Sequence, residues 1–254
     1  MLEYNSINNL KGVKMKSFKD YLNDSISSDN FINETRKFIP SNYVELRDKI
    51  TSGYFRLDEI ELPKDLDSLS GLFEGRDKIN KKGLETWDVS YVSKINHMFK
   101  DCVSFTGKEI ENWNVKNVTE VHGTFGGCIK FDADLSNWKL RKVKNLVGTF
   151  EGCSSFTGKG LDKWNVSRVT HMNLLFEGCL NFTGETIKDW DTSKVKVMKR
   201  MFKDCKHLKV EYLKDWDLSS LVWLEHIFKD TGIKPKDVPE NFRIKAEELG
   251  QKMF

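Results

Sequence analysis

Five cysteines are the residues of this chain whose type and spacing could most readily do chemistry. They follow one another at intervals of 26, 25, 26 and 26 residues: Cys102, Cys128, Cys153, Cys179 and Cys205. Thiols at one position of successive repeats could come close enough to form disulfides or to share a metal ion. A straight row cannot surround one ion tetrahedrally, however, and an odd number leaves one thiol over. Free cysteine is usually a small buried hydrophobic residue, so the spacing predicts a reduced structural column, no metal site and a reducing compartment.

The histidine, serine and acidic residues offer no catalytic set. His97 and His226 share a repeat position but lie five repeats apart, and the other histidines stand at unrelated positions. A nucleophile needs a base and an orienting group held close together. The aspartates that might serve, Asp88, Asp191 and Asp217, instead follow tryptophans as turn and cap residues, and asparagine replaces them at 114 and 165. We therefore predict no catalytic residue, no cofactor and no enzymatic activity.

A run of cations in the middle of the chain is a candidate partner-binding surface. The position four residues after the tryptophan holds a cation in three consecutive repeats, and further cations lie nearby: Lys142, Arg168 and Lys194, with Arg141, Lys196 and Arg200. These residues either bind an acidic partner or phosphate, or form a solvated face that keeps the array soluble. The solvated face is favoured because 41 Lys and Arg nearly balance 38 Asp and Glu. Nucleic-acid binding would want a stronger imbalance than the net charge of +3, so we do not expect it.

All these residues belong to a repeat of about 26 residues. Tryptophan opens six repeats: Trp87, Trp113, Trp138, Trp164, Trp190 and Trp216. Phenylalanine follows each tryptophan by twelve residues: Phe99, Phe125, Phe150, Phe176, Phe202 and Phe228. The cysteines come three residues later. A fixed period of this length predicts stacked repeats whose matching side chains form ladders, and burying each large side chain contributes about 1.5–3 kcal/mol.

Each repeat is expected to hold one short helix and one short strand. Apolar residues at positions 5, 8, 11 and 12 after the tryptophan predict one stripe of a helix or 3₁₀ segment. Ser90 and its equivalents suit an N-cap, and the glycine of "FEGC" suits the C-terminal stop. The segment before the next tryptophan has room for a strand that would pair in parallel with its neighbours. The predicted fold is an α/β solenoid of about seven turns over residues 61–232.

The repeat resembles a known family. Its consensus, "W-[DN]-V-S-x-V-x-x-M-x-x-[ML]-F-x-G-C-x-x-F-x-G", is similar to the BspA-type surface-protein repeat, also called the DUF285 or mycoplasma-lipoprotein-like repeat. The similarity covers about residues 66–231. This family is related to the leucine-rich repeats, so the resemblance implies a leucine-rich-repeat-like, right-handed coil. It also implies protein binding or adhesion without catalysis, commonly at a cell surface.

The two ends do not repeat. Amphipathic patterns over 17–40 and 42–55 predict a helical N-terminal cap or docking segment within residues 1–60, and residues 233–254 are expected to form a C-terminal cap with a short closing helix over 241–254. The stretch "KGVKMKSFKDYL" could be encoded as a ribosome-binding site followed by a start codon, which makes Met15 a candidate natural start. "MKSFKDYLND" looks somewhat like the leaders of internal head proteins of tailed phages.

The sequence favours binding as the general activity. We expect a non-enzymatic repeat module that presents its surface to a protein partner. The alternatives are a structural or virion-associated phage component, or a phage-encoded effector that acts on a host protein. No apolar run approaches the ~20 residues that span a bilayer, and no secretory signal is evident. A cytoplasmic or virion-associated location is therefore expected.

Overall fold

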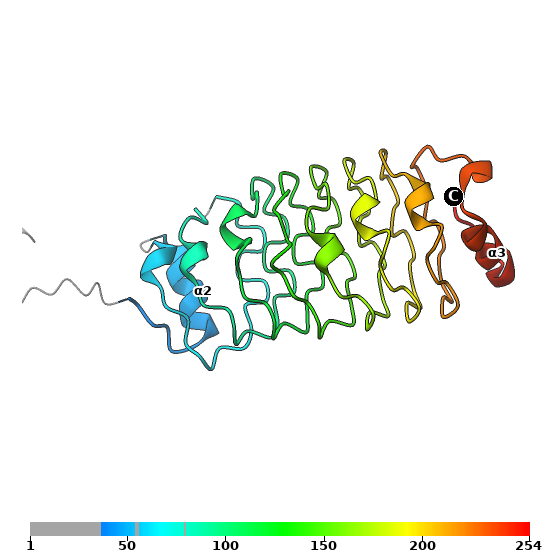
Figure 1. Ribbon diagram of the computed structural model, residues 1–254. Coiled ribbons are helices and arrows are strands. Elements are labelled where there is room, and N and C mark those ends of the chain that lie inside the picture. The colour runs from blue at the N-terminus through cyan, green and yellow to red at the C-terminus, as the bar shows by residue number, and fades with distance from the viewer. Residues whose placement is uncertain (1–36, 54–55, 79) are drawn as a thin grey trace, which may run out of the picture. The chain divides into compact units, whose positions relative to one another are not determined.

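Successive repeats lie side by side in sequence order and are joined by backbone hydrogen bonds (Figure 1). The computed structural model describes residues 37–53, 56–78 and 80–254, and residues 37–254 form one compact unit. The proposed start at Met15 and residues 17–36 of the predicted helix over 17–40 fall outside this range. Its last residues, 37–40, are not helical, and Phe38 forms a parallel bridge with Ile60. The backbone N–H of Phe99 donates to the carbonyl of Thr124 at 2.9 Å, and that of Phe125 donates to Thr149 at 3.0 Å. The same bond recurs in the later repeats and fixes their register.

The described residues contain two α-helices and several short 3₁₀ segments. These elements are α2 (Tyr43–Ser52), η1 (Leu57–Glu59), η2 (Leu84–Thr86), η3 (Lys108–Ile110), η4 (Leu161–Lys163), η5 (Glu185–Ile187), η6 (Val210–Leu213), η7 (Pro235–Asp237) and α3 (Glu240–Leu249). The elements η2 to η6 each stand at or just before a tryptophan of the repeat. They occupy the segment in which the sequence predicted a strand.

The prediction of one parallel strand per repeat is wrong. Among the described residues, neighbouring repeats pair only through isolated parallel bridges such as Lys94–Glu120 and His171–Val197. The segment before each tryptophan turns back on itself instead of extending, because a 3₁₀ bond such as that from the N–H of Trp164 to the carbonyl of Leu161 (3.1 Å) closes it. Without strands in each repeat, the chain is not an α/β solenoid of the leucine-rich-repeat type.

The prediction of a helix between the tryptophan and the cysteine is also wrong. His97 and Asp101 have φ values of 54° and 60°, in the left-handed region, and the equivalent residues of the other repeats also have positive φ. A left-handed residue at every fourth position interrupts an α-helix. The chain instead forms overlapping β-turns, in which the N–H of Met98 donates to Ile95 at 3.2 Å and that of Lys100 donates to His97 at 3.1 Å. Apolar residues three apart therefore share one side without a helix.

The tryptophans of the repeat are buried and tie each repeat to the one before it. All six are at most 6% exposed. The indole Nε1 of Trp138 donates to the carbonyl of Ile110 at 3.0 Å, and that of Trp190 donates to Leu161 at 3.0 Å. Equivalent bonds join the other four tryptophans to the preceding repeat. Each indole thus satisfies its one polar atom while its ring fills the core.

The phenylalanines form a second ladder beside the tryptophans. Rings of successive repeats are nearly parallel, with centroids 5.5–6.1 Å apart from Phe73 to Phe228. A second column contributes rings such as Phe131 and Phe156, whose centroids lie 4.2 Å from those of Phe125 and Phe150. Offset aromatic contacts at these separations add to the hydrophobic gain of burial. The core is therefore continuous through the repeats.

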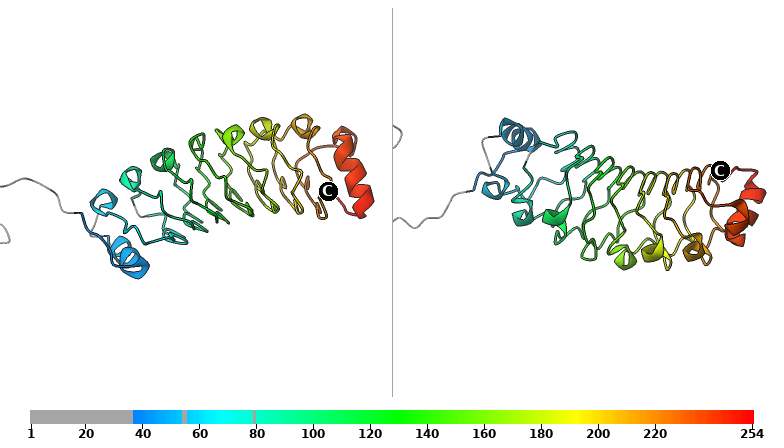
Figure 2. Two further views of the ribbon diagram at one scale, coloured as in Figure 1. Left: turned by 60° about the horizontal axis from the view of Figure 1, so that its bottom comes forward. Right: turned by 90° about the horizontal axis from the view of Figure 1, so that it is seen from above.

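The last repeat is closed by α3 and the residues after it (Figure 2). Phe242 stands 26 residues after Trp216, is fully buried and lies 6.3 Å from the Trp216 ring. Its neighbour Asn241 replaces the missing indole, because its Nδ2 donates to the carbonyls of Leu213 at 3.4 Å and Trp216 at 2.9 Å. The carbonyl of Met253 then accepts from the N–H of Phe228 at 2.9 Å. These contacts satisfy groups that a seventh tryptophan repeat would otherwise bond.

At the other end, α2 lies against the half-repeat that carries Phe73 and precedes the first tryptophan repeat. Asn42 caps its N-terminus by accepting from the N–H of Glu45 at 3.0 Å. Leu46 and Ile50 are buried in the common core, and the hydroxyl of Tyr43 donates to the carbonyl of Ser70 at 2.7 Å. In the described part of the chain, no helix is long and apolar enough to cross a bilayer.

Candidate functional site

The candidate cations are held outward by buried neighbours on both sides. In the fourth repeat, Val166 and Val169 are buried, and Arg168 lies between them in an exposed bend. Asn165 shapes this bend by accepting from the N–H of Ser167 at 3.1 Å, an arrangement known as an Asx turn. The next repeat has the same turn, in which Asp191 accepts from the N–H of Ser193 at 3.1 Å. The buried valines therefore fix the backbone while the cation points into solvent.

Six exposed cations form one surface, which we call the basic stripe. Its members occupy positions 3, 4 and 6 after the tryptophan in the third, fourth and fifth repeats: Arg141, Lys142, Lys144, Arg168, Lys194 and Lys196. Within the described residues, none of the six forms an ion pair. Residues 138–150 and 163–176 contain no Asp or Glu at all. The balanced charge of the whole chain thus conceals a local excess of positive charge.

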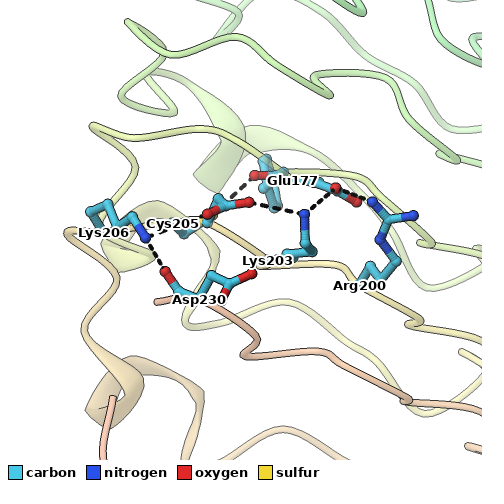
Figure 3. Close-up of polar contacts among 8 residues, drawn as sticks. Glu177, Arg200, Lys203, Cys205, Lys206 and Asp230 are labelled. Atoms are coloured by element: carbon cyan, nitrogen blue, oxygen red, sulfur yellow. Dashed lines mark hydrogen bonds and ion pairs between the residues drawn. The ribbon is translucent and has the colours of Figure 1, made fainter. Parts of the chain in front are cut away.

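Arg200, which the sequence grouped with these cations, lies elsewhere. Its guanidinium pairs with the carboxylate of Glu177, and the Nζ of Lys203 donates to the same oxygen at 3.1 Å (Figure 3). Lys203 also pairs with Asp204 at 3.0 Å. Glu177 is 7% exposed, so its buried charge is balanced by two cations. Arg200 therefore makes a contact between repeats and lies outside the row of unpaired cations.

Two exposed apolar residues beside the basic stripe were not recognised from the sequence. Val222 and Trp223 are 58% and 43% exposed. Trp223 lies seven residues after Trp216 and outside the tryptophan ladder. The ammonium group of Lys199 lies 4.7 Å from the centroid of its ring, which is within cation–π range.

One histidine pair was also missed. His97 and His122 occupy adjacent positions in successive repeats, and their ring centroids are 5.0 Å apart. Burial, and then the nearby His97 and Lys100, lowers the pKa of His122. The described residues include no group of three or more His, Cys, Asp or Glu side chains that could hold a metal ion. The pair alone does not make a metal centre.

The five thiols of the cysteine column are free and buried. Each Sγ donates to the carbonyl of a phenylalanine in the preceding repeat, as Cys153 does to Phe125 at 3.0 Å and Cys179 to Phe150 at 3.0 Å. Burial raises the pKa of every one of these thiols. Because the thiolate is the reactive form, thiols with raised pKa values are poorly suited to nucleophilic chemistry. The hydrogen bonds of the column join successive repeats instead.

One family model matches most of the chain. The model of a family described as "Mycoplasma protein of unknown function, DUF285" matches residues 67–160 and 144–254. The chain belongs to this family. The DUF285 match begins in the half-repeat that carries Phe73 and runs to Phe254, so it includes the whole basic stripe and α3. No curated protein matches the chain.

Proposed function

We propose that this DUF285 chain is a non-enzymatic binding module whose basic stripe contacts an acidic protein partner. The observation that carries the proposal is the row of exposed cations without ion pairs at equivalent positions of three consecutive repeats. Isolated surface cations are normally interspersed with acids. Here Lys142, Arg168 and Lys194 are exposed in consecutive repeats, and none of them forms an ion pair within the described residues, although Asp191 lies near enough to Lys194 to interact with its charge.

The stacked core supports this role by holding the cations rigidly. Backbone bonds from the N–H of Thr170 to Lys144 (2.9 Å) and from Lys196 to Thr170 (2.8 Å) fix the spacing of the three repeats. A surface that is ordered before binding loses little conformational entropy when the partner arrives. The resemblance to BspA-type surface-protein repeats also supports binding as the general activity.

Charge complementarity of this kind predicts a salt-dependent interaction. Exposed ion pairs contribute about 0.2–1 kcal/mol each, so six cations support moderate affinity and fast association rather than very tight binding. The five free thiols support a reducing compartment as the place where binding occurs.

Charge reversal along the stripe tests the proposal. The purified chain is used to capture proteins from its native host, the captured protein is identified and purified, and its affinity is measured by calorimetry. The variant Lys142→Glu/Arg168→Glu/Lys194→Glu should weaken binding about tenfold or more, because three attractions become repulsions. Rising ionic strength should weaken binding of the unaltered chain.

A matched control carries the same change of charge on another side of the repeats. Lys108, Lys188 and Lys214 are exposed and lie at or beside the 3₁₀ segments. Changing all three to Glu also takes the formal net charge from +3 to about −3, a change of −2 at each position. Equal losses of affinity in the two triple variants would reject the basic stripe as the contact surface. Self-association of the purified chain without any captured partner would instead favour a structural role.

A further inference from the structure

The basic stripe continues directly into an apolar patch formed by Val222 and Trp223. The N–H of Val222 donates to the carbonyl of Lys196 at 2.9 Å, which places the patch in the repeat next to the stripe. Lys199 packs against this patch, with its Nζ 4.7 Å from the Trp223 ring centroid, and pairs with Glu225 at 3.0 Å. Exposed aromatic residues beside cations are typical anchors of protein interfaces.

The repeat spacing is compatible with the pitch of an α-helix. Backbone bridges near the stripe imply a separation of about 4.8 Å between repeats, and the phenylalanine rings are 5.5–6.1 Å apart. An α-helix advances about 5.4 Å per turn, which falls between these values. An extended peptide presents side chains on one face only every ~6.6 Å, so its charges lose register within a few repeats.

We infer that the basic stripe together with Val222 and Trp223 is a docking surface for one acidic amphipathic helix of the partner. The inference rests on the proposed function and specifies its partner. The helix lies along the row of repeats, with an acidic residue on each of three successive turns facing Lys142, Arg168 and Lys194. An apolar residue one turn further on contacts Trp223.

The lengths of the two surfaces agree. Along the row of repeats, the third and sixth repeats are three spacings apart, or about 14–18 Å, and Trp223 stands at position 7 of the sixth repeat, three residues past the position of the cations. A helix with acids at positions i, i+4 and i+7 and an apolar residue at i+11 covers about 16 Å. The matching pattern is therefore acidic-x₃-acidic-x₂-acidic-x₃-apolar, and it is the pattern used in the test.

The test compares fluorescently labelled peptides of equal composition by fluorescence polarisation. One peptide carries three Glu and one Leu in the matching pattern within an alanine-rich helix, and a second carries the same residues permuted around the helix. We expect the matching peptide to bind at least tenfold more tightly. Equal binding of the two peptides, or tighter binding of a DNA duplex of the same charge, would overturn the assignment of an acidic helix.

Variants of the apolar patch separate the anchor from the charges. Trp223→Ala should lower the affinity for the matching peptide about five- to tenfold. It should leave the affinity for a peptide with Ala in place of Leu unchanged. Ile244→Ala truncates an apolar side chain that is 50% exposed on α3, and it should change neither of the two affinities. Equal effects of Trp223→Ala on both peptides would refute the anchor role. Unchanged thermal melting of both variants shows that the fold is intact.

The two proposals fail in distinguishable ways. If the triple variant Lys142→Glu/Arg168→Glu/Lys194→Glu no longer binds the captured partner but the matching and permuted peptides bind alike, the proposed binding function holds and the helical partner is rejected. If the captured partner binds this triple variant with unchanged affinity, the basic stripe itself is rejected as the contact surface.

Discussion

Substituting Gly160 by Ala should test how closely the repeats are stacked. Gly160 directly precedes η4 as its N-cap residue, with a φ of 81°, and a Cβ there would stand 2.1 Å from the backbone nitrogen of Ser136 and 2.6 Å from the carbonyl carbon of Leu135. Both atoms belong to the backbone of the preceding repeat, so no side-chain rotation can relieve the clash. The two repeats must move apart.

The magnitude follows from three contributions to the free energy of unfolding. A non-glycine residue in the left-handed region costs about 1–2 kcal/mol, and overpacking costs about 1–3 kcal/mol. Separation of the repeats also weakens the bonds of Leu135 to Lys159 (3.1 Å) and of Trp164 to Leu135 (3.3 Å), each worth about 0.5–1.5 kcal/mol. We expect a total loss of about 3–6 kcal/mol.

Gly152→Ala is the matched control for this substitution. Gly152 lies eight residues earlier in the same repeat with a φ of 74°, but a Cβ there would meet its nearest atoms, in Gly127, only at 3.5 Å. Its substitution should cost about 0–1.5 kcal/mol, because the strain is partly offset by the lower entropy of the unfolded chain. Urea denaturation followed by tryptophan fluorescence measures the free energy of unfolding of both variants. Losses within about 1 kcal/mol of each other would refute the close backbone approach.

Three further results are expected. The five thiols should react with a disulfide reagent only as fast as the protein unfolds, because burial raises their pKa; rapid labelling of the native chain would contradict this. Trp138→Phe should cost about 1–3 kcal/mol through a lost buried hydrogen bond and a cavity, whereas Trp223→Phe, at an exposed site, should cost less than about 0.5 kcal/mol in the same urea titration. Hydrogen bonds from Ser193 lower the pKa of Asp191 in the folded chain. The ionised carboxylate therefore stabilises the fold at pH values above the ordinary Asp pKa, and this stabilisation is lost as the pH falls through the lowered pKa. Asp191→Asn, which matches Asn165, should therefore keep neutral-pH stability and flatten the acid limb of the stability curve; an unchanged acid limb would argue against it.

The period, the side-chain columns and membership of DUF285 could be obtained from the sequence, but the local conformation could not. Apolar residues three apart fit a helix and a chain of β-turns equally well, because both bring every third residue to one side. Gly123 and Gly148 lie inside the predicted helix, at positions where the backbone has φ values of 58° and 60°. A recurrent glycine within a helical pattern is unfavourable, and it was the available signal against a helix.

The exposed tryptophan had a simpler signal. The chain has seven tryptophans and the ladder uses six, which leaves Trp223 without a structural position. The pairing of His97 with His122 was harder to predict, because their positions differ by one between repeats. Only the backbone geometry, in which the His97 ring lies over Gly123, brings the two rings together.

One repeat position shows how a stacked array can acquire a binding surface without changing its core. Four residues after the tryptophan, the first repeat has Tyr91, whose hydroxyl donates to the carbonyl of Leu62 at 2.7 Å. The second has Asn117, whose Nδ2 donates to Ser90 at 2.7 Å. In both cases the side chain bonds back to the preceding repeat and helps to hold the stack.

The later repeats use the same position differently. Lys142 still reaches back to the Oδ1 of Asn117 at 2.8 Å, whereas Arg168 and Lys194 are exposed and make no side-chain hydrogen bond within the described residues. Since the indole, thiol and backbone groups already join these repeats, the position is no longer needed for stacking. Its cations can therefore be exchanged at little cost to stability, and this freedom is what a surface selected for its partner requires.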